Sequence, residues 1–285
     1  MILLSHIKCA WPTSEEIAYF ERTSENVGRF HYNHQMSHPQ QLAFLKIVVA
    51  TLGSKIKTQK VLEIGSYDVN GTIRDIVGAC ESYTGVDLVA GPGVDLVAFG
   101  HQLEFESESF DLTLSAECFE HDVHWTNTFL NMIRLTKSNG IVAFTCASLG
   151  RPEHGTLRSD PSLSPGTQSL NMDYYKNLTE NDFRNSIVLA DFFSKFIFHY
   201  NPISCDLYFM GIKKPLDLNH SLGIDLPSSQ EIESETRRMP LSHHVIRAPL
   251  RILLRITPLS IYNKIAYRYW RLLVSTAKIL GSGAV

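Results

Sequence analysis

Acidic residues are absent from the last part of the chain. From Met239 onward there is no Asp or Glu, whereas seven cations occur there: Arg247, Arg251, Arg255, Lys264, Arg268, Arg271 and Lys278. The whole chain of 285 residues has a formal net charge of −3, so the part before this tail is markedly acidic. An acidic body with a basic tail suggests two separate partners.

Cysteine is scarce and scattered. The five cysteines form no C-x-x-C pair, and their number is odd. A disulfide framework or a zinc knuckle is therefore not expected, and a reducing compartment, the cytoplasm, fits better. The first ten residues lack the basic and apolar regions of a signal peptide. No uncharged apolar run reaches the length of about 18 residues that a membrane span needs.

Hydrophobic residues make up 44% of the chain and charged residues 19%, which is typical of a globular protein. This length allows one large core, or one core with an appendage. We expect an N-terminal helix and lid segment over residues 1–37 and a main domain over 38–214. A polar linker over 215–238 and a basic amphipathic helical tail over 239–285 follow.

Residues 60–71, KVLEIGSYDVNG, predict a buried strand over 61–64, a glycine turn, and a helix over 72–77. Gly65 and Ser66 let a ligand approach the backbone, and Gly71 lets the helix begin close to the sheet. Such a turn is expected to present free backbone N–H groups where α/β sheets bind nucleotides. The middle glycine of G-x-G-x-x-G is missing, so the turn alone does not specify the ligand.

Further apolar runs of strand length follow at 83–87, 94–98, 110–115 and 140–146, and helical segments fit between most of them. The second strand ends in Asp87, whose carboxylate can accept both hydroxyls of a ribose. The runs 193–200 and 203–213 flank Asn201-Pro202 and predict an antiparallel hairpin. These features indicate an α/β fold.

In their order and spacing these motifs resemble class I S-adenosylmethionine (SAM)-dependent methyltransferases, specifically the type 11 methyltransferase-domain family. The resemblance covers residues 38–214, and its later motifs are Phe110-Asp111, Glu120-His121 and the KSNG run at 137–140. It implies a doubly wound, Rossmann-like, seven-stranded sheet with an antiparallel last strand. It also implies that SAM contacts nine residues: Glu63, Gly65, Ser66, Gly71, Asp87, Leu88, Gly100, His101 and Glu117.

One departure from the family concerns the turn after the third strand. Many relatives have an aspartate there to contact the adenine, whereas this chain has Gly100, His101 and Gln102. In the N-terminal region, a helix is predicted over 13–30, and in this family such a helix commonly lies over the cofactor pocket. The segment 29–38, rich in histidine and aromatics, is either an irregular loop or a lid.

Carboxylates and histidines crowd the segment 115–125 that follows the fourth strand. Glu120-His121 could simply fix the loop, or His121 or His124 could act as a general base, because the pKa of histidine lies near neutrality. Glu117-x-x-Glu120-His121 is also similar to the Glu-x-x-Glu-His of ubiquinone-pathway O-methyltransferases, where the trio binds a divalent ion. These alternatives stay open, and we assign no metal ligand from the sequence.

A polar loop over 147–156 follows the fifth strand. Arg151, Glu153 and His154 are candidates for contacting the acceptor, and a solvated connection is the alternative. Our candidate catalytic residues are therefore His121, His154 and Glu120. The stretch from there to Asn171, rich in Ser, Pro and Gly, is expected to be a mobile surface loop.

The resemblance implies transfer of a methyl group to a hydroxyl or amine of a small molecule, such as a sugar or a cell-envelope precursor. A non-catalytic methyltransferase-like subunit and an NAD-dependent oxidoreductase are the alternatives. In the tail, Arg247, Arg251 and Arg255 recur every four residues, and aromatic residues follow them. This pattern is typical either of a helix in a membrane interface or of an appendage that packs on protein. Nucleic acid is not favoured, because the tail is too apolar.

Overall fold

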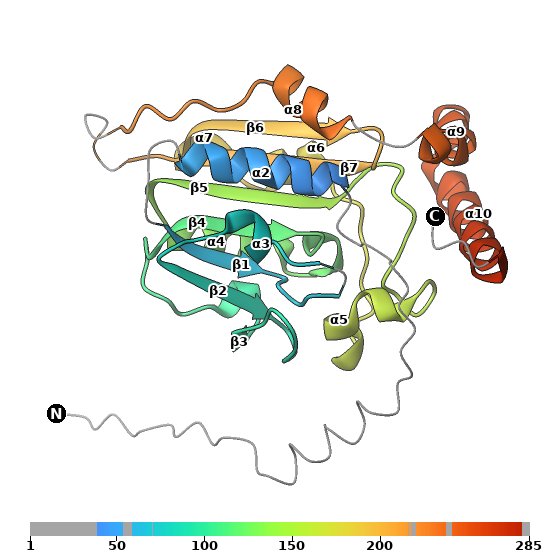
Figure 1. Cartoon of the computed structure of the whole chain (residues 1–285), viewed down its shortest axis with the longest axis horizontal. Helices are drawn as coiled ribbons and strands as arrows, with labels where there is room; N and C mark the ends of the chain where they lie inside the picture. The colour runs from blue at the N-terminus through green and yellow to red at the C-terminus, as the bar shows by residue number, and fades with distance from the viewer. Residues whose placement is uncertain are drawn as a thin grey trace, which may run out of the picture. The chain divides into compact units, whose positions relative to one another are not determined.

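The computed structural model describes residues 39–53, 59–69, 71–215, 217, 221–237 and 241–280. The helix predicted over 13–30 and the histidine-rich segment 29–38 lie outside these residues. One seven-stranded sheet with the order β3-β2-β1-β4-β5-β7-β6 forms the centre (Figure 1). Its strands are β1 (Lys60–Ile64), β2 (Ser82–Asp87), β3 (Leu96–Val97), β4 (Phe110–Ala116), β5 (Thr136–Ala147), β6 (Phe193–Asn201) and β7 (Asp206–Lys213).

The direction of the strands matches the predicted doubly wound sheet. Strands β1 to β5 pair in parallel, whereas β7 lies antiparallel between β5 and β6. The predicted hairpin is therefore confirmed, and its returning strand is inserted into the sheet. Because β1, β4 and β5 run in the same direction, the loops that follow Ile64, Ala116 and Ala147 meet at one edge.

Helices cover both faces of the sheet. The main domain contains α2 (Pro39–Gly53), α3 (Arg74–Val77), α4 (Trp125–Leu135), α5 (Pro165–Ser169), α6 (Glu180–Ser186) and α7 (Leu189–Phe192), with the 3-10 turns η1 (Gly100–Gln102), η2 (Phe119–His121) and η3 (Pro161–Leu163). Residues of α2 and α3 belong to one core cluster, and residues of α4 and α6 to the other. Alternation along β5 divides the two cores, since Val142 and Phe144 enter one and Ile141 and Ala143 the other.

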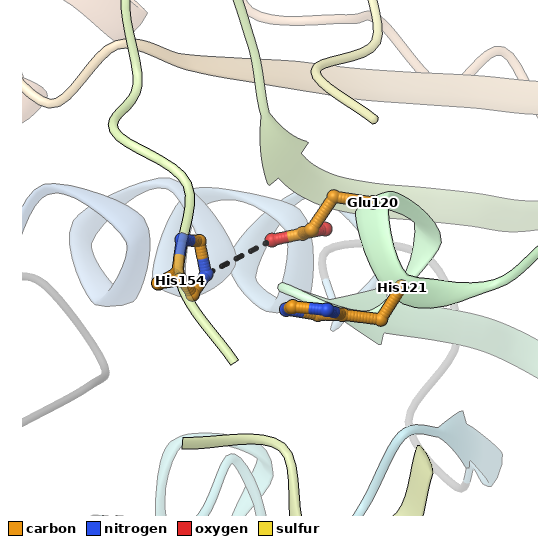
Figure 2. A group of neighbouring side chains, drawn as sticks. All are labelled: Glu120, His121 and His154. Carbon is orange, nitrogen blue, oxygen red and sulfur yellow. Dashed lines mark ion pairs between the residues drawn. The ribbon is translucent and has the colours of Figure 1, made fainter. Parts of the chain in front are cut away.

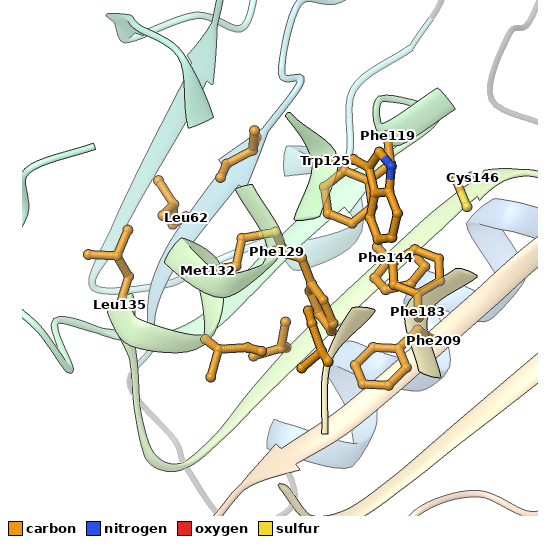
Figure 3. Packing of buried hydrophobic residues seen from close by; sticks show 14 of the residues in the cluster. Leu62, Phe119, Trp125, Phe129, Met132, Leu135, Phe144, Cys146, Phe183 and Phe209 are labelled. Carbon is orange, nitrogen blue, oxygen red and sulfur yellow. The ribbon is translucent and has the colours of Figure 1, made fainter. Parts of the chain in front are cut away.

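Aromatic rings fill the core between the sheet and α4 (Figure 3). Phe144 is fully buried, and its ring stacks on Phe183 at a centroid distance of 4.6 Å and on Phe209 at 5.1 Å. Phe129 of α4 meets Phe144 edge-on at 5.4 Å. Such ring pairs contribute more stability than the burial of their apolar surface alone. This cluster therefore fixes α4 and α6 against the strands of the sheet.

The opposite edge of the sheet explains one of the family motifs. Asp111, the second residue of β4, accepts a hydrogen bond from the backbone N–H of Lys60 at 2.8 Å. It also forms an ion pair with Lys137 of β5 at 2.9 Å. The carboxylate therefore joins the beginnings of three neighbouring strands, so the motif Phe110-Asp111 has a structural role at this end of the sheet.

The segment predicted as a polar linker contains α8 (Ser229–Thr236), which packs against α2 (Figure 1). Ser228 and Glu231 form a capping box at its N-terminus. Ile224 and Ile232 of this region are buried in the core that α2 shares with the sheet. Part of the linker therefore belongs to the main domain. The average composition of the segment is polar, but its two isoleucines bury enough apolar surface to hold it there.

Two helices, α9 (Leu241–Ile256) and α10 (Leu259–Leu280), follow in the basic tail. Leu250 of α9 packs against Tyr262 and Ala266 of α10 in a small core of their own. The Tyr262 hydroxyl donates a hydrogen bond of 2.6 Å to the backbone carbonyl of Gly150 in the loop after β5. Within the described residues, no helix combines the length and the apolar character that crossing a membrane requires.

Replacing Phe144 by alanine tests the aromatic core. We expect Phe144→Ala to lower the free energy of unfolding by about 3–5 kcal/mol, because it leaves a cavity among rings that cannot close over it. Denaturant-induced unfolding followed by circular dichroism measures this change.

The matched control is Phe192→Ala, since Phe192 of α7 keeps 36% of its surface exposed. Its expected cost is below about 1 kcal/mol. Equal losses in the two variants would contradict the assignment of Phe144 to the core.

Candidate active site

A large cavity opens at the edge of the sheet where β1, β2 and β4 end. It encloses about 1130 Å³ including its open mouth, which is enough for a ligand of nucleoside size. All nine residues predicted to contact a cofactor line it: Glu63, Gly65, Ser66, Gly71, Asp87, Leu88, Gly100, His101 and Glu117. Separate motifs, spread over more than fifty residues, therefore meet around one space. Their individual roles stay predictions.

The glycine turn supplies space and few free donors. Gly65 has a φ of +85°, and a Cβ at this position would lie 2.7 Å from the Cβ of Cys118, so only glycine fits. The sequence predicted free N–H groups here, but those of Gly65 and Ser66 both donate to the carbonyl of Val86, at 2.8 and 3.0 Å. That prediction is corrected at these two groups, because β2 ends close enough to use them.

Asp87 ends β2 and faces the cavity, where the prediction placed it. Its two carboxylate oxygens accept hydrogen bonds from the backbone N–H groups of Tyr67 at 3.1 Å and Leu88 at 2.7 Å. Burial raises the pKa of this carboxyl, although these backbone donors oppose the shift. A carboxylate oxygen has two lone pairs, so each oxygen can still accept a bond from a ligand hydroxyl.

Glu63 lies inside the sheet and is almost fully buried, with 4% of its surface exposed. The Tyr83 hydroxyl donates a bond of 2.5 Å to Glu63 Oε2. Burial raises the pKa of Glu63 to about 7, against the opposing effects of this bond and of the Arg74 charge. The Glu63 carboxyl therefore titrates near neutral pH, at the wall of the cavity.

The turn after β3, η1, explains why a glycine replaces the family's aspartate. A Cβ at Gly100 would lie 2.6 Å from Cγ2 of Thr128 and 2.9 Å from Cγ2 of Ile64, so α4 and β1 leave no room for a side chain. The Asn131 amide donates to the Gly100 carbonyl at 2.8 Å. The neighbouring His101 lines the cavity, and its ring lies 4.4 Å from that of His124.

An ion network lies at the same edge, beyond β4. Glu117 has a positive φ of 49° and directs Oε2 to the Arg151 guanidinium, 3.3 Å away. Arg151 also pairs with Asp206 at 3.0 Å and donates to the Ser204 carbonyl at 2.9 Å. Burial and the nearby Asp206 and Glu120 charges raise the pKa of Glu117 well above its ordinary value. Arg151, a candidate for contacting the acceptor, is thus committed to protein partners.

The three candidate catalytic residues converge beside this network (Figure 2). Glu120 and His121 come from η2, and His154 comes from the loop after β5; their ligand atoms lie within 4.8 Å of one another. His121 also lines the cavity. Burial raises the pKa of Glu120 to about 7 and lowers that of His121 to about 4. Burial and the nearby charges also lower the pKa of His154.

The sequence missed one wall of the cavity. The stretch predicted as a mobile surface loop forms η3 and α5, and five of its residues line the cavity, together with Met172 just beyond it: Leu163, Ser164, Pro165, Gly166 and Thr167. Gly166 is buried, and a Cβ there would lie 2.8 Å from Asp87 Oδ1. The only signal in the sequence was Pro165-Gly166, which fits a helix start as well as a loop.

The cavity suits SAM in its chemistry. Asp87 can hold hydroxyls, Glu63 and Glu117 are carboxyl groups that suit a ligand with cationic centres, and Gly65 leaves the space at the turn empty. The Ser66 hydroxyl is buried at the wall and has no hydrogen-bond partner, so a polar ligand atom would satisfy it.

Residues 70–144 match the sequence model of a family described as Methyltransferase domain. This match agrees with the resemblance of the sequence to SAM-dependent methyltransferases. The match begins at the end of the glycine turn, after Gly65 and Ser66, and reaches into β5, so it includes Asp87, the turn η1 and the Glu120-His121 pair. The inserted antiparallel β7 agrees with this family and not with the predicted alternative, a dehydrogenase. No curated protein matches the chain in sequence.

Several solved methyltransferases are similar to this chain in structure. A 1,6-didemethyltoxoflavin-N1-methyltransferase of Burkholderia thailandensis shares 16% identity over 73% of this chain and 94% of its own, with a TM-score of 0.43. The N-methyltransferase NodS of Bradyrhizobium japonicum shares 12% identity over 69% of this chain and 98% of its own, with a TM-score of 0.42. Phosphoethanolamine N-methyltransferase 2 of Haemonchus contortus shares 15% identity over 66% of this chain and 61% of its own, with a TM-score of 0.41.

The raised pKa of Glu63 predicts that the stability of the ligand-free protein depends on pH. Its folded pKa of about 7 lies above the ordinary value of 4.5, so the folded state binds more protons between these values. We therefore expect the free energy of unfolding of the wild type to fall as pH rises from 4.5 to 7, relative to Glu63→Gln, by up to about 1.4 kcal/mol per pH unit.

Denaturant unfolding at a series of pH values measures this difference. The control Glu106→Gln, at an exposed carboxylate, should follow the wild-type curve. Parallel curves for the wild type and Glu63→Gln would show that folding does not raise the pKa of Glu63, against this assignment.

Proposed function

We propose that this protein is a class I, SAM-dependent methyltransferase that acts on a hydroxyl, or an amine, of a small polar molecule such as a sugar or a cell-envelope precursor. The observation that carries this proposal is the clustering of ionisable groups where the cavity meets the loops after β4 and β5. Glu117 and His121 line the cavity there, and Glu120 and His154 stand next to His121. An acceptor with polar groups finds partners at such a wall, whereas an apolar acceptor would leave them unsatisfied.

The chemical demands of the reaction fit this wall. When bound, SAM supplies a methyl group on a positively charged sulfur, so the acceptor needs alignment more than activation. A hydroxyl or amine acceptor loses a proton as the new bond forms. Glu120, His121 and His154 stay our predicted groups for this step, because they are close to one another and His121 reaches the cavity.

We also propose that the basic helices bring the enzyme to the anionic surface of a membrane, at the cytoplasmic face. Six apolar side chains of α9 and α10 are exposed: Ile252, Ile256, Leu259, Ile261, Ile265 and Leu272. The exposed cations Arg255, Lys264 and Arg268 accompany them. Apolar and cationic side chains together on helices too polar to span a bilayer favour binding in its interface.

Isothermal titration with SAM tests the cofactor site. We expect the wild type to bind SAM with micromolar affinity, and Asp87→Ala to weaken binding at least tenfold, because the variant removes both carboxylate oxygens from the cavity. NAD should not bind.

The exposed Asp191→Ala serves as the matched control and should bind SAM like the wild type. Thermal melting shows whether each variant is folded. Failure of the folded wild type to bind SAM would leave the non-catalytic interpretation in place, and binding of NAD instead would favour an oxidoreductase.

Sedimentation with lipid vesicles tests the tail. We expect the protein to bind vesicles that contain phosphatidylglycerol, and to bind less at high salt, because salt screens the cations. The double change Ile252→Asp with Ile256→Asp should abolish binding, since these side chains are 61% and 72% exposed and place their apolar surface in the interface.

Leu157→Asp is the control, because Leu157 is an equally exposed apolar side chain of the main domain. It should sediment like the wild type. If the wild type does not sediment with anionic vesicles, the exposed faces of α9 and α10 bind a protein partner instead.

A further inference from the structure

The carboxylate of Glu120 is buried without a hydrogen-bond partner. Its side chain is 0% exposed, and neither Oε1 nor Oε2 accepts a hydrogen bond. The Nδ1 atom of His121, 5% exposed, also lacks a partner. Burying polar groups without hydrogen bonds is costly, and groups left in this state often mark the place of an ion. Three such atoms in adjacent residues point to a missing positive charge.

The tautomer of His154 strengthens this argument. Its Nδ1 lies 3.2 Å from the carbonyl of Pro152, which can only accept a hydrogen bond, so Nδ1 carries the proton. The neutral ring then turns the lone pair of Nε2 toward Oε1 of Glu120, 3.7 Å away. Two acceptors facing each other repel unless a cation or a proton lies between them. A histidine held through its other nitrogen by a carbonyl is the usual arrangement of a metal ligand.

The spacing of the three side chains fits a small ion. Two ligand atoms about 2.1 Å from a tetrahedral metal are about 3.4 Å apart. The separation of 3.7 Å between His154 and Glu120 is close to this value, and the whole set lies within 4.8 Å. Small rotations of the three side chains would bring their ligand atoms to the distances that a metal ion requires. Figure 2 shows the two rings and the carboxylate pointing toward one another.

The local charge also favours a cation. The Arg151 guanidinium is already shared by Glu117 and Asp206, at 3.3 and 3.0 Å. Within the described part of the chain, His154 is the only ion-pair partner of Glu120, and only if its ring is protonated. Because Glu117 directs a carboxylate oxygen to Arg151, the site differs from the Glu117, Glu120 and His121 trio considered from the sequence.

We propose that Glu120, His121 and His154 together bind one divalent transition-metal ion, of the class of Zn²⁺, Mn²⁺ or Fe²⁺. Two imidazole nitrogens with one carboxylate suit these ions, whereas Mg²⁺ and Ca²⁺ prefer oxygen ligands throughout. Three protein ligands leave positions open for water or substrate. His121 lines the cavity, so the ion would lie beside the acceptor and polarise its hydroxyl. This last role rests on the proposed function and would replace direct proton transfer to the three side chains, because the ion would hold their lone pairs. The binding of the ion does not rest on the proposed function.

Titration of the chelator-treated, full-length protein with Zn²⁺ and with Mn²⁺ tests the site. We expect one ion per chain with micromolar or tighter affinity, and at least a tenfold loss in Glu120→Gln and in His154→Ala. Mg²⁺ should bind at least tenfold more weakly than Zn²⁺. His124→Ala is the matched control, since it removes a histidine of the same segment that is not part of the trio, and it should bind like the wild type.

Two further measurements guard against a variant that fails to fold. Zn²⁺ should raise the melting temperature of the wild type, and Cu²⁺ bound to the wild type should show coupling to imidazole nitrogens by electron paramagnetic resonance. Wild-type protein that binds none of these ions, or variants that bind as well as it does, would overturn the proposal. Measuring SAM binding by the chelator-treated protein separates the outcomes, because SAM binding without metal binding removes the metal site alone.

Discussion

The geometry of the reactive edge depends on one buried guanidinium, that of Arg151. It contacts Glu117 after β4 and Asp206 at the start of β7, while its backbone carbonyl accepts from Asn177 at 2.8 Å. Four segments that are distant in sequence are held by one residue. Removing a single partner from such a buried network leaves an uncompensated charge. The position of His154, three residues further along, therefore follows from an electrostatic constraint as well as from packing.

The sheet and its hairpin could be predicted from sequence because their signals are local. Apolar runs of strand length marked β1, β2, β4 and β5, and Asn201-Pro202 marked the turn of the hairpin. The residues around the cavity were predictable for a related reason: they lie at or beyond the ends of strands, and parallel strands end at a common edge. The local pattern did not show that β2 lies close to the glycine turn. The Val86 carbonyl of β2 accepts hydrogen bonds from the N–H groups of Gly65 and Ser66, so these groups are not free.

Long-range proximity explains what the sequence left open. Nothing in the polar loop after β5 says that His154 turns toward Glu120 and His121, more than thirty residues earlier; the Pro152 carbonyl and the ring of Tyr175 set that orientation. The Ser, Pro and Gly content of the segment before Asn171 resembles that of a solvated loop, yet Gly166 approaches Asp87 because it has no side chain. Likewise, two isoleucines anchor α8 within a segment whose average composition is polar.

The hydrogen bond from Tyr262 to Gly150 gives the tail a mechanical connection to the chemistry. Gly150 immediately precedes Arg151, and Leu254 of α9 occupies the space where any larger residue at 150 would place its Cβ. A displacement of the helix pair must either break this buried contact or carry the backbone at Gly150 with it. The free energy of one such bond is about 0.5–1.5 kcal/mol. This value is therefore the expected size of the coupling by which binding at the tail changes the free energy of the loop after β5. Because such coupling is reciprocal, binding in the cavity changes the free energy of the tail by the same amount.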